Sequence, residues 1–453
     1  MEVVIQECRG RHRSSTMLHP LAPEQRTKQT MNRQRMTASA VAAVAVLSLS
    51  LTACASGAGP ADGGEASIDY VIWDANALEP YKDVIAAFNE EHPEITVNIQ
   101  ALPWDQYWTK LQTQASSKTL PDVFWINEPN AGLYATNGAL AAVDTANGID
   151  PANFPDASIQ SYTFDGELYA APTGYATMGV WYNTALFDQA GVAYPADGWT
   201  QEDFVAAATA ISTALGSEGV FGAAAAPWTG QETSYNTIYQ SGGEVISEDG
   251  TTSGYDDPGT IAGVKLWVDL AQAGVSPSVA QITDTPIPQY FTSGKLAMMW
   301  SGPWNANSLK DSEIADTVAV APLPTGESDL VTTIQGGADA VSAYSENKEA
   351  AQTFQAFLGS KEAQELYGAA GLGIPAFNGV ASSFTDAFPQ WDLSLFSDQA
   401  AHAAPYPVSL NTAAWNTLEN EYLTKAWSGE LTVEEACTQL AAAMNDVLAA
   451  ERK

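Results

Sequence analysis

The amino-acid sequence predicts an α/β protein in which helices cover a parallel or mostly parallel sheet. Short apolar strands alternate with segments of helical periodicity over residues 69–126, which is the order that builds such a sheet. Of the 453 residues, 45% are hydrophobic and 10% are aromatic, which suits a folded chain with a large core. The length allows two or three domains, and the absence of long apolar runs excludes a multi-span membrane protein.

The first five elements are expected in the order strand, helix, strand, helix, strand. They cover, in turn, residues 69–73, 81–88, 95–99, 104–115 and 123–126. Apolar residues recur at helical spacing in the second and fourth segments and alternate in the third. Ligands of such sheets bind beyond the carboxyl ends of the strands, which are here Trp73-Asp74-Ala75-Asn76 and Asn127-Glu128-Pro129-Asn130.

Later elements are expected from their start signals. Thr200 with Asp203, and Thr432 with Glu435, have the spacing of capping boxes, so each pair is expected to begin a helix. Further helices are expected at 259–273 and 347–358, and a strand at 296–300 that runs into a turn at 301–304.

Charge is distributed unevenly along the chain, whose net charge is −35. Seven of the 18 basic residues precede position 36, whereas residues 54–453 carry 50 acids and 11 bases. The acidic body argues against a nucleic-acid partner and against electrostatic docking to anionic lipid.

Residues 1–53 are interpreted as a signal peptide region. Arg33 and Arg35 precede the uncharged stretch 38–51, which is too short to span a bilayer but suits the apolar part of a signal peptide. The stretch ends in Leu51-Thr52-Ala53-Cys54, which resembles the lipobox of bacterial lipoproteins and implies a palmitate-type lipid anchor on Cys54. The alternative is an ordinary secretory cleavage site with an incidental cysteine.

Two further predictions concern the N-terminal part. Residues 1–30 fit no signal peptide, so we expect translation to begin at Met31. Residues 54–67 are rich in Gly, Ala, Pro and acids, which predicts a flexible, lipid-anchored tether. Cys437 is the one cysteine of the folded body, so no internal disulfide is expected, and its helical stripe favours a small core residue.

A family resemblance rests on a series of segments. In chain order they are the lipobox, VIWDANALEPYKDVIAAFNEEHPEITVNI, LPDVFWIN, DGELYAAPTG with WYNTALFDQAGV, FTSGKLAMMWSGPWN, VAPLPTG and IQGGADAVSA. Their order and spacing over residues 68–450 are similar to those of the extracellular solute-binding proteins of family 1. These are the sugar-capturing subunits of bacterial ABC importers, including the maltose-binding type.

The resemblance implies a periplasmic-binding-protein-like fold: two α/β lobes joined by a multi-strand hinge, with the ligand in the cleft between them. It places chain crossings near Pro172–Tyr175, after Leu323-Pro324-Thr325 and near Ile374–Phe377. Lobe 1 would then hold residues 68–174 plus 326–376, and lobe 2 residues 175–325 plus 377–453.

Sugar recognition needs aromatic faces for C–H surfaces and polar partners for hydroxyls. The aromatic candidates are Trp73, Trp125, Tyr175, Trp228, Trp304 and Trp415. Trp304 matches a Gly-Pro-Trp at which similar family members stack on sugar, and the family places a cleft aromatic near Trp415. The alternative for each ring is core or interface packing. The tryptophans at helical spacing are expected in the core, namely Trp104, Trp108, Trp267 and Trp427.

The polar candidates follow strand ends and crossings. They are Asp74, Asn76, Asn127, Glu128, Glu232, Gln335, Gly337 and Asp339, and the alternative for each acid is solvated surface. Maltose-binding relatives carry an Asp-Arg pair near Glu128-Pro129, so this chain departs from that recognition mode. The body's one arginine is Arg452, which disfavours anionic ligands and favours neutral polyols.

No catalytic motif is recognisable, and the body holds two histidines, His92 and His402, so neither an enzyme, a metal nor a cofactor is expected. The alternatives are a glycoside hydrolase with paired carboxylates, a binding protein for a non-sugar solute, and a lipid-anchored adhesin. The resemblance implies a monomer on the extracytoplasmic face of the cell membrane, with a sugar or oligosaccharide ligand and ABC permease subunits as partners.

Overall fold

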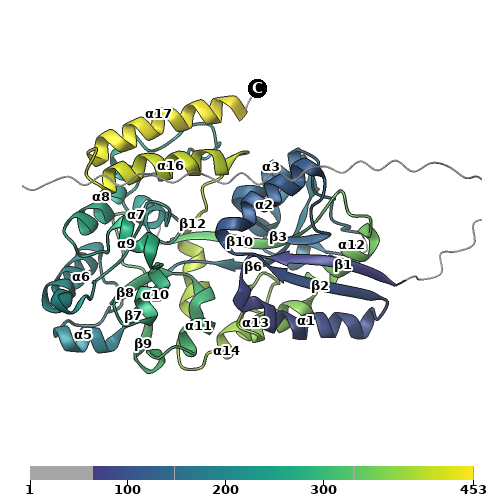
Figure 1. Ribbon diagram of the computed structural model, residues 1–453, viewed down its shortest axis with the longest axis horizontal. Helices are drawn as coiled ribbons and strands as arrows, with labels where there is room; N and C mark the ends of the chain where they lie inside the picture. Colours follow the sequence, from purple (N-terminus) through teal and green to yellow (C-terminus); the bar gives the residue numbers. More distant parts are fainter. Residues whose placement is uncertain (1–64, 147, 330–331, 452–453) are drawn as a thin grey trace, which may run out of the picture. The chain divides into compact units, whose positions relative to one another are not determined.

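The computed structural model describes residues 65–146, 148–329 and 332–451, which belong to one compact unit. Two α/β lobes joined by crossing strands make up this unit (Figure 1). The expectations for the signal peptide region, for Met31 and for Cys54 lie outside the described residues, as does most of the tether. Within the described residues, no helix is both long and apolar enough to cross a membrane.

Lobe 1 contains the larger sheet, with strand order β11-β6-β10-β3-β1-β2 and β12 paired to β10. The strands are β1 Ala66–Ile72, β2 Ile95–Ala101, β3 Val123–Asn127, β6 Ala170–Ala176, β10 Thr332–Val341, β11 Ile374–Pro375 and β12 Ala403–Pro405. The covering helices are α1 Leu78–Glu91, α2 Trp104–Ser117, α3 Glu128–Thr136, α4 Asp156–Gln160, α12 Lys348–Leu358 and α13 Lys361–Ala369. A short ribbon is formed by β4 Thr163–Phe164 and β5 Glu167–Leu168.

Lobe 2 is built on the three-stranded sheet β8-β7-β9 and is richer in helices. Its strands are β7 Gly179–Asn183, β8 Met298–Ser301 and β9 Val318–Pro322. Its helices are α5 Thr184–Ala190, α6 Gln201–Leu215, α7 Ser234–Gln240, α8 Pro258–Gln272, α9 Val279–Asp284, α10 Ile287–Thr292, α11 Ala306–Lys310, α14 Ser382–Asp386, α15 Ser394–Asp398, α16 Thr412–Trp427 and α17 Val433–Glu451.

The expected parallel order holds for the first three strands, and β12 is also parallel to β10. β1 pairs in parallel with β2 and with β3, but β10 runs antiparallel to both β3 and β6, and the sheet of lobe 2 is antiparallel. The expectation drawn from the first five elements is therefore confirmed for β1, β2 and β3, whereas the complete sheet of lobe 1 is mixed. The cause is that β10 enters lobe 1 from lobe 2, in the direction opposite to the strands that the β-α-β units lay down.

Hydrophobic cores follow the lobes. The core of lobe 1 draws on residues 68–171 and 338–376, and the main core of lobe 2 on 178–323 and 415–448. A smaller cluster on the other side of the lobe 2 sheet combines residues 181–318 with 374–396. Each core thus gathers segments that are distant in the chain, while the lobe boundaries expected from the sequence remain a prediction.

The expected helix starts are confirmed. Thr200 and Asp203 form a reciprocal capping box at α6. At α17, the Thr432 amide donates to Glu435 Oε2 at 3.0 Å, and the Glu435 amide donates to Thr432 Oγ1 at 3.1 Å. Such caps contribute about 1 kcal/mol each to stability. Cys437 is fully buried on α17, as its stripe predicts, and burial raises the pKa of its thiol to about 12.

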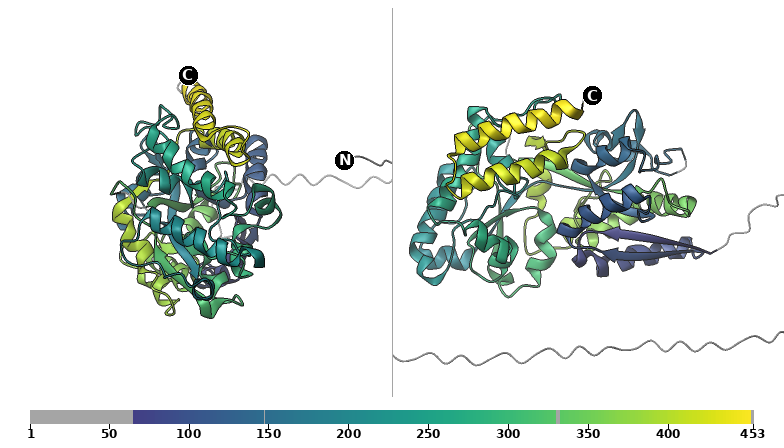
Figure 2. Two further views of the ribbon diagram at one scale, coloured as in Figure 1. Left: turned by 90° about the vertical axis from the view of Figure 1, so that its left-hand side faces the viewer. Right: turned by 45° about the horizontal axis from the view of Figure 1, so that its top comes forward.

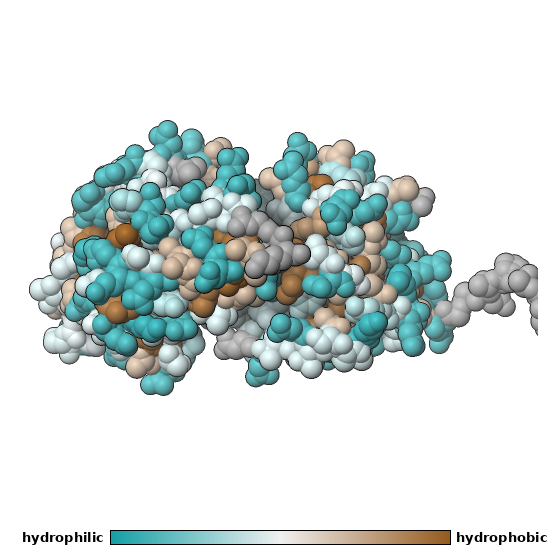
Figure 3. All heavy atoms as spheres, turned by 90° about the horizontal axis from the view of Figure 1, so that it is seen from above, coloured by the Kyte–Doolittle hydropathy of each residue, from teal (hydrophilic) through white to brown (hydrophobic). Residues whose placement is uncertain are grey.

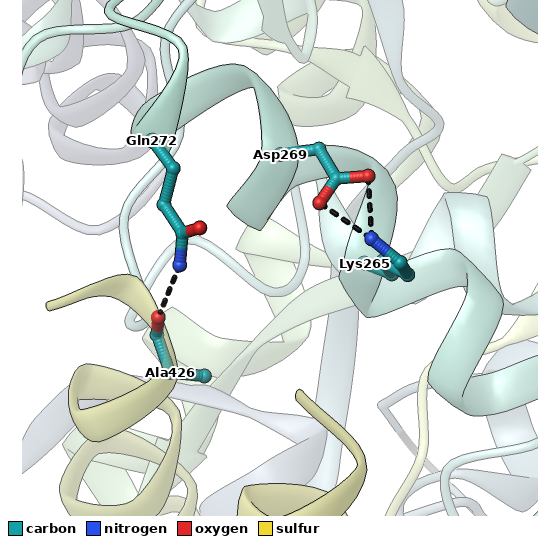
Figure 4. A network of polar contacts seen from close by, with 4 residues as sticks. All are labelled: Lys265, Asp269, Gln272 and Ala426. Atoms are coloured by element: carbon teal, nitrogen blue, oxygen red, sulfur yellow. Dashed lines mark hydrogen bonds and ion pairs between the residues drawn. The ribbon is translucent and has the colours of Figure 1, made fainter. Parts of the chain in front are cut away.

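The helices α16 and α17 lie side by side along lobe 2 (Figure 2). Gln272 Nε2 of α8 donates to the Ala426 carbonyl of α16 at 3.1 Å, while Lys265 pairs with Asp269 within α8 (Figure 4). Glu451, in the last turn of α17, accepts hydrogen bonds from Ser409 Oγ and from the amides of Leu410 and Asn411, at 2.9–3.0 Å. The last turn of α17 therefore fixes the segment that leads into α16, while α8 contacts the other end of that helix.

Candidate ligand-binding cleft

The candidate site lies where the two lobes meet across β6, β10 and β12 (Figure 1). Seen from above, the surface is indented between the lobes, and hydrophobic residues gather beside the indentation (Figure 3). Tyr406, directly after β12, donates its amide to the carbonyl of Ile334 in β10 at 2.9 Å. Burial and the neighbouring carboxylates of Glu419, Glu232 and Glu128 raise the pKa of its phenol. This phenol is therefore within electrostatic range of carboxyls from both lobes.

Glu128 is positioned at the hinge by the end of β3 and by a contact with β10. It is the first residue of α3, directly after β3, where a helix N-terminus favours negative charge. Its Oε1 accepts the amide of Gly336 in β10 at 3.0 Å, and Tyr162 donates to the carbonyl of the same glycine at 2.8 Å. Burial raises the pKa of Glu128 to about 7, against the hydrogen bonds from Gly336 and Ser161, which lower it.

The other polar candidates of lobe 1 follow β1 and β3. Asp74 Oδ1 accepts the amide of Asn76 at 2.8 Å, and burial raises the pKa of this half-buried carboxyl. The Asn76 side chain is exposed. Asn127 is buried and accepts a hydrogen bond from Asn130 Nδ2 at 2.8 Å. These side chains lie at the carboxyl ends of parallel strands, as expected.

Tryptophans form one cluster at the end of β1. The ring of Trp73 lies 4.8 Å from Trp125, 5.5 Å from Trp104 and 5.7 Å from Trp108, measured between centroids. Trp125 is 8% exposed, whereas Trp104 is 49% exposed, so the expectation that Trp104 is core is wrong. Trp104 is the first residue of α2, and its ring contacts Trp73 and Trp108 while half of its surface stays exposed.

The remaining tryptophans at helical spacing differ in how far they are buried. Trp267 and Trp427 are buried, which confirms their expected core role, and Trp108 is half-buried.

Lobe 2 contributes a loop that precedes α7. Trp228 in this loop is 46% exposed, and Glu232 is half-buried, with a pKa raised by burial. Trp304 is half-buried against the core of lobe 2, and its ring folds back over Gly302, where a Cβ would lie only 2.0 Å from ring carbon Cζ3. Only glycine leaves room for this ring position.

The hinge strands carry three further candidates. Tyr175 of β6 pairs with Gly336 of β10, and Gln335 pairs with Ala176; both side chains are half-buried. A Cβ at Gly337 would meet no atom within 4 Å, so the backbone there borders open space. A ligand can approach the main chain of β10 at this position.

Two candidates are not brought to the cleft. Asp339 is 1% exposed and accepts hydrogen bonds from Tyr70 at 2.8 Å and Thr173 at 3.0 Å, inside lobe 1. β10 keeps an unbroken register with β3 here, so Asp339 shares a strand face with Gly337 two residues before it, and this face passes from open space at Gly337 into the interior of lobe 1 at Asp339. Burial raises the pKa of Asp339 to about 7.

Trp415 is the second, because it is fully buried in the core of lobe 2 and donates to Ser409 Oγ at 3.0 Å. Its neighbour Asn416 instead donates to Tyr235 Oη at 3.1 Å. The sequence analysis missed Tyr406, Tyr162 and Asn416, which no motif marks. Trp104 was accessible to reasoning, since Pro103 before it ends the approach to α2.

Basic groups do not accompany these carboxyls. Among the described residues, no basic side chain lowers the pKa values of Glu128, Glu232 or Glu419, which burial raises. The described part of the chain also holds no group of three or more His, Cys, Asp or Glu suited to a metal ion. The site offers carboxyls, amides, hydroxyls and indole faces.

A family model described as bacterial extracellular solute-binding protein matches residues 83–393. The chain belongs to this family. Among the relatives of this solute-binding protein is the galactooligosaccharide-binding protein of Bacillus subtilis, 25% identical over 81% of this chain and 84% of that one. Another is the maltooligosaccharide ABC transporter solute-binding lipoprotein of Streptococcus pneumoniae, 24% identical over 83% of this chain and 88% of that one.

The fold is similar to that of an ABC substrate-binding protein from Listeria monocytogenes in complex with cycloalternan. The TM-score is 0.79 at 24% identity, covering 85% of this chain and 99% of that one. The expected family and the periplasmic-binding-protein-like fold are thereby confirmed. The family is one of extracellular substrate-binding proteins rather than enzymes, and neither a glycoside hydrolase nor a carrier of a non-sugar solute is favoured.

Proposed function

We propose that this solute-binding protein captures an oligosaccharide between its lobes and passes it, unreacted, to the permease of an ABC importer. The observation that carries the proposal is a pair of exposed indoles, Trp104 on lobe 1 and Trp228 on lobe 2, beside a hinge with carboxyls that lack cationic partners. Relatives whose names state oligosaccharide ligands support the same ligand class.

The chemistry of the site fits a neutral sugar. Pyranose C–H faces pack on indoles, and hydroxyls donate to carboxylates such as Glu128 and Glu232, with bonds that strengthen when water is excluded. An anionic ligand would be repelled, because these carboxyls have no basic neighbour among the described residues. The proposed ligand contacts are Trp73, Asp74, Asn76, Trp104, Trp125, Asn127, Glu128, Tyr175, Trp228, Glu232, Trp304, Gln335, Gly337 and Tyr406.

Ligand would favour a closed arrangement of the lobes, since only there can residues of both lobes contact one sugar chain. Closure would bend the hinge strands and present a two-lobe surface to the permease. The proposed lobes are residues 68–174 plus 326–376 and 175–325 plus 377–453. Small-angle scattering at saturating ligand tests closure: an unchanged radius of gyration would contradict it.

The proposed localisation is the extracytoplasmic face of the cell membrane, to which a lipid on Cys54 anchors the monomeric protein. Acyl chains supply membrane affinity by apolar burial, about 0.8 kcal/mol for each buried methylene. In cell fractionation, Cys54→Ser is expected to move the protein from the membrane to the soluble fraction. A variant that stays with the membrane would exclude this anchor.

The deciding experiment is a thermal-shift screen of the purified protein against maltotriose, a galactotriose and cycloalternan, with glucose 6-phosphate as an anionic control. A ligand that binds only the native state raises the melting temperature by mass action. At a ligand concentration of a hundred times Kd, the free energy of unfolding rises by about 2.7 kcal/mol. Product analysis of the same mixtures should find the sugars intact. Turnover, or a shift with the anionic sugar alone, would contradict the proposal.

A further inference from the structure

A buried carboxyl in lobe 2 forms a compact polar network. Glu419 of α16 is 4% exposed, and Tyr235 Oη and Asn416 Nδ2 each donate to its Oε2 at 2.7 Å. Tyr255 Oη makes a short hydrogen bond to Oε1. No basic side chain takes part, so three hydrogen bonds offset the cost of burying this group.

One branch of the network leads to the cleft. The Tyr235 ring supports the loop that carries Trp228, because a Cβ at Gly230 would lie 2.7 Å from Tyr235 Cε1. The Tyr235 amide also donates to the Gly230 carbonyl at 2.8 Å. On its other side, the Tyr235 ring meets the Tyr406 ring edge-on, with centroids 5.5 Å apart. Rotation or displacement of Tyr235 would move both neighbours.

The other branch leads away from the cleft. Tyr255 precedes α8 and is fully buried, and burial, the carboxyl of Glu419 and, more weakly, Cys437 and Tyr406 raise the pKa of its phenol. Among the described rings, Tyr255 makes no stacking or edge contact with Tyr406. The two tyrosines therefore bind the same carboxyl, and it is Tyr235 that contacts the Tyr406 ring and the loop that carries Trp228.

We propose that Glu419 is a positioning residue for ligand binding: through Tyr235 it fixes the Trp228 loop and Tyr406 in the arrangement that receives a sugar. This inference rests on the proposed function. Glu419 itself does not contact the ligand, because almost none of its surface is exposed. Sequence alone gives no sign of this role, since Glu419 stands on a helix face like many acids of the chain.

The experiment compares Tyr235→Phe with Tyr255→Phe, which each remove one hydroxyl from the same carboxyl. Calorimetric titration uses the sugar of the thermal-shift panel that binds the wild-type protein most tightly. Tyr235→Phe is expected to weaken binding about tenfold, the size expected for one hydrogen bond to a charged group. Tyr255→Phe should lower the melting temperature comparably and keep the affinity within about twofold of wild type. Equal affinity losses in both variants would overturn the proposal.

Two substitutions at Glu419 complete the test. Glu419→Gln keeps an acceptor for Tyr235 and should retain most of the affinity, whereas Glu419→Ala should lose at least as much as Tyr235→Phe. Hydrogen exchange of ligand-free protein should show faster exchange of residues 226–235 in Glu419→Ala and Tyr235→Phe, and wild-type exchange in Tyr255→Phe. If Glu419→Ala does not fold, the tyrosine pair decides alone.

Failure of the proposed function is distinguishable from failure of this inference. If no sugar binds the wild-type protein, the proposed function fails, and with it the assignment of Glu419 to ligand binding. Sugar binding by all variants with wild-type affinity, or unchanged exchange of residues 226–235 in Glu419→Ala and Tyr235→Phe, overturns the inference and leaves the proposed function standing.

Discussion

The two lobes hold their exposed aromatic rings in different ways. In lobe 1, Trp73, Trp104, Trp108 and Trp125 support one another, with neighbouring centroids 4.8–5.7 Å apart. In lobe 2, Trp228 stands on a loop that rests on a tyrosine held by a buried carboxyl. Ring packing fixes the first surface and hydrogen bonding the second, so the two should respond differently to truncation and to pH.

The largest expected effect is on stability in lobe 1. Trp125→Ala should lower the free energy of unfolding by about 3–5 kcal/mol, because it leaves a cavity among tightly packed rings. Trp125 also donates to Tyr81 Oη at 3.3 Å, a bond that the variant loses. Urea denaturation followed by circular dichroism measures the change. A decrease of less than about 1 kcal/mol in the free energy of unfolding would mean that the four tryptophans do not depend on one another for packing.

Trp228→Ala should separate binding from folding. An exposed ring on a loop contributes little to the fold, so stability is expected to change by no more than about 0.5 kcal/mol. Affinity for the panel sugar should fall about tenfold, since aromatic contacts dominate such interfaces. Tyr194→Ala, at a ring 44% exposed on lobe 2, is a matched control that should leave affinity unchanged. Equal affinities for the two variants would remove Trp228 from the site.

Stability should fall as the pH rises from about 5 to 7. Burial raises the pKa values of Asp339 in lobe 1 and Glu419 in lobe 2 to about 7, so the folded state binds more protons than the unfolded state over this range. The contribution of each protonated carboxyl to the free energy of unfolding is therefore present at low pH. It is lost as the pH rises, by at most about 1.4 kcal/mol per pH unit for each group.

Denaturation curves at several pH values test this, with Asp339→Asn and Glu419→Gln each expected to flatten the slope. Only Glu419→Gln should also alter the pH dependence of sugar affinity. The same result for Asp339→Asn would show that lobe 1 relies on its carboxyl as lobe 2 does.

The smallest expected effect is that of Trp104→Ala. Trp73 and Trp108 remain behind the removed ring, so part of the aromatic surface persists, and affinity should fall about two- to threefold. A titration series with sugars of increasing length measures it. An effect as large as that of Trp228→Ala would mean that both lobes depend on single rings.

Local patterns predicted the elements well, because spacing and capping act over a few residues. The first strands, α1, α2 and the capping boxes at Thr200 and Thr432 follow from such signals. The antiparallel entry of β10 could not be predicted, since it depends on how the chain returns from the other lobe. The lobes themselves were accessible only through the family resemblance.

The site was harder to predict, because single residues decide it. Asp339 lies inside lobe 1, although Gly337 on the same face of β10 borders open space, because two residues separate the cleft from the interior. One step along α16 separates buried Trp415 from Asn416, which faces Tyr235.

The hydrogen bonds that Glu451 accepts from Ser409, Leu410 and Asn411 have a practical consequence for engineering. They hold the segment at Ser409–Asn411, so shortening the C-terminus by a few residues is expected to loosen the entry to α16 far from the cut. Limited proteolysis of a chain that stops at Ala450 should reveal new cleavage near Leu410. A biosensor built on this scaffold is therefore better given its reporter through an outer loop than in place of its final turn.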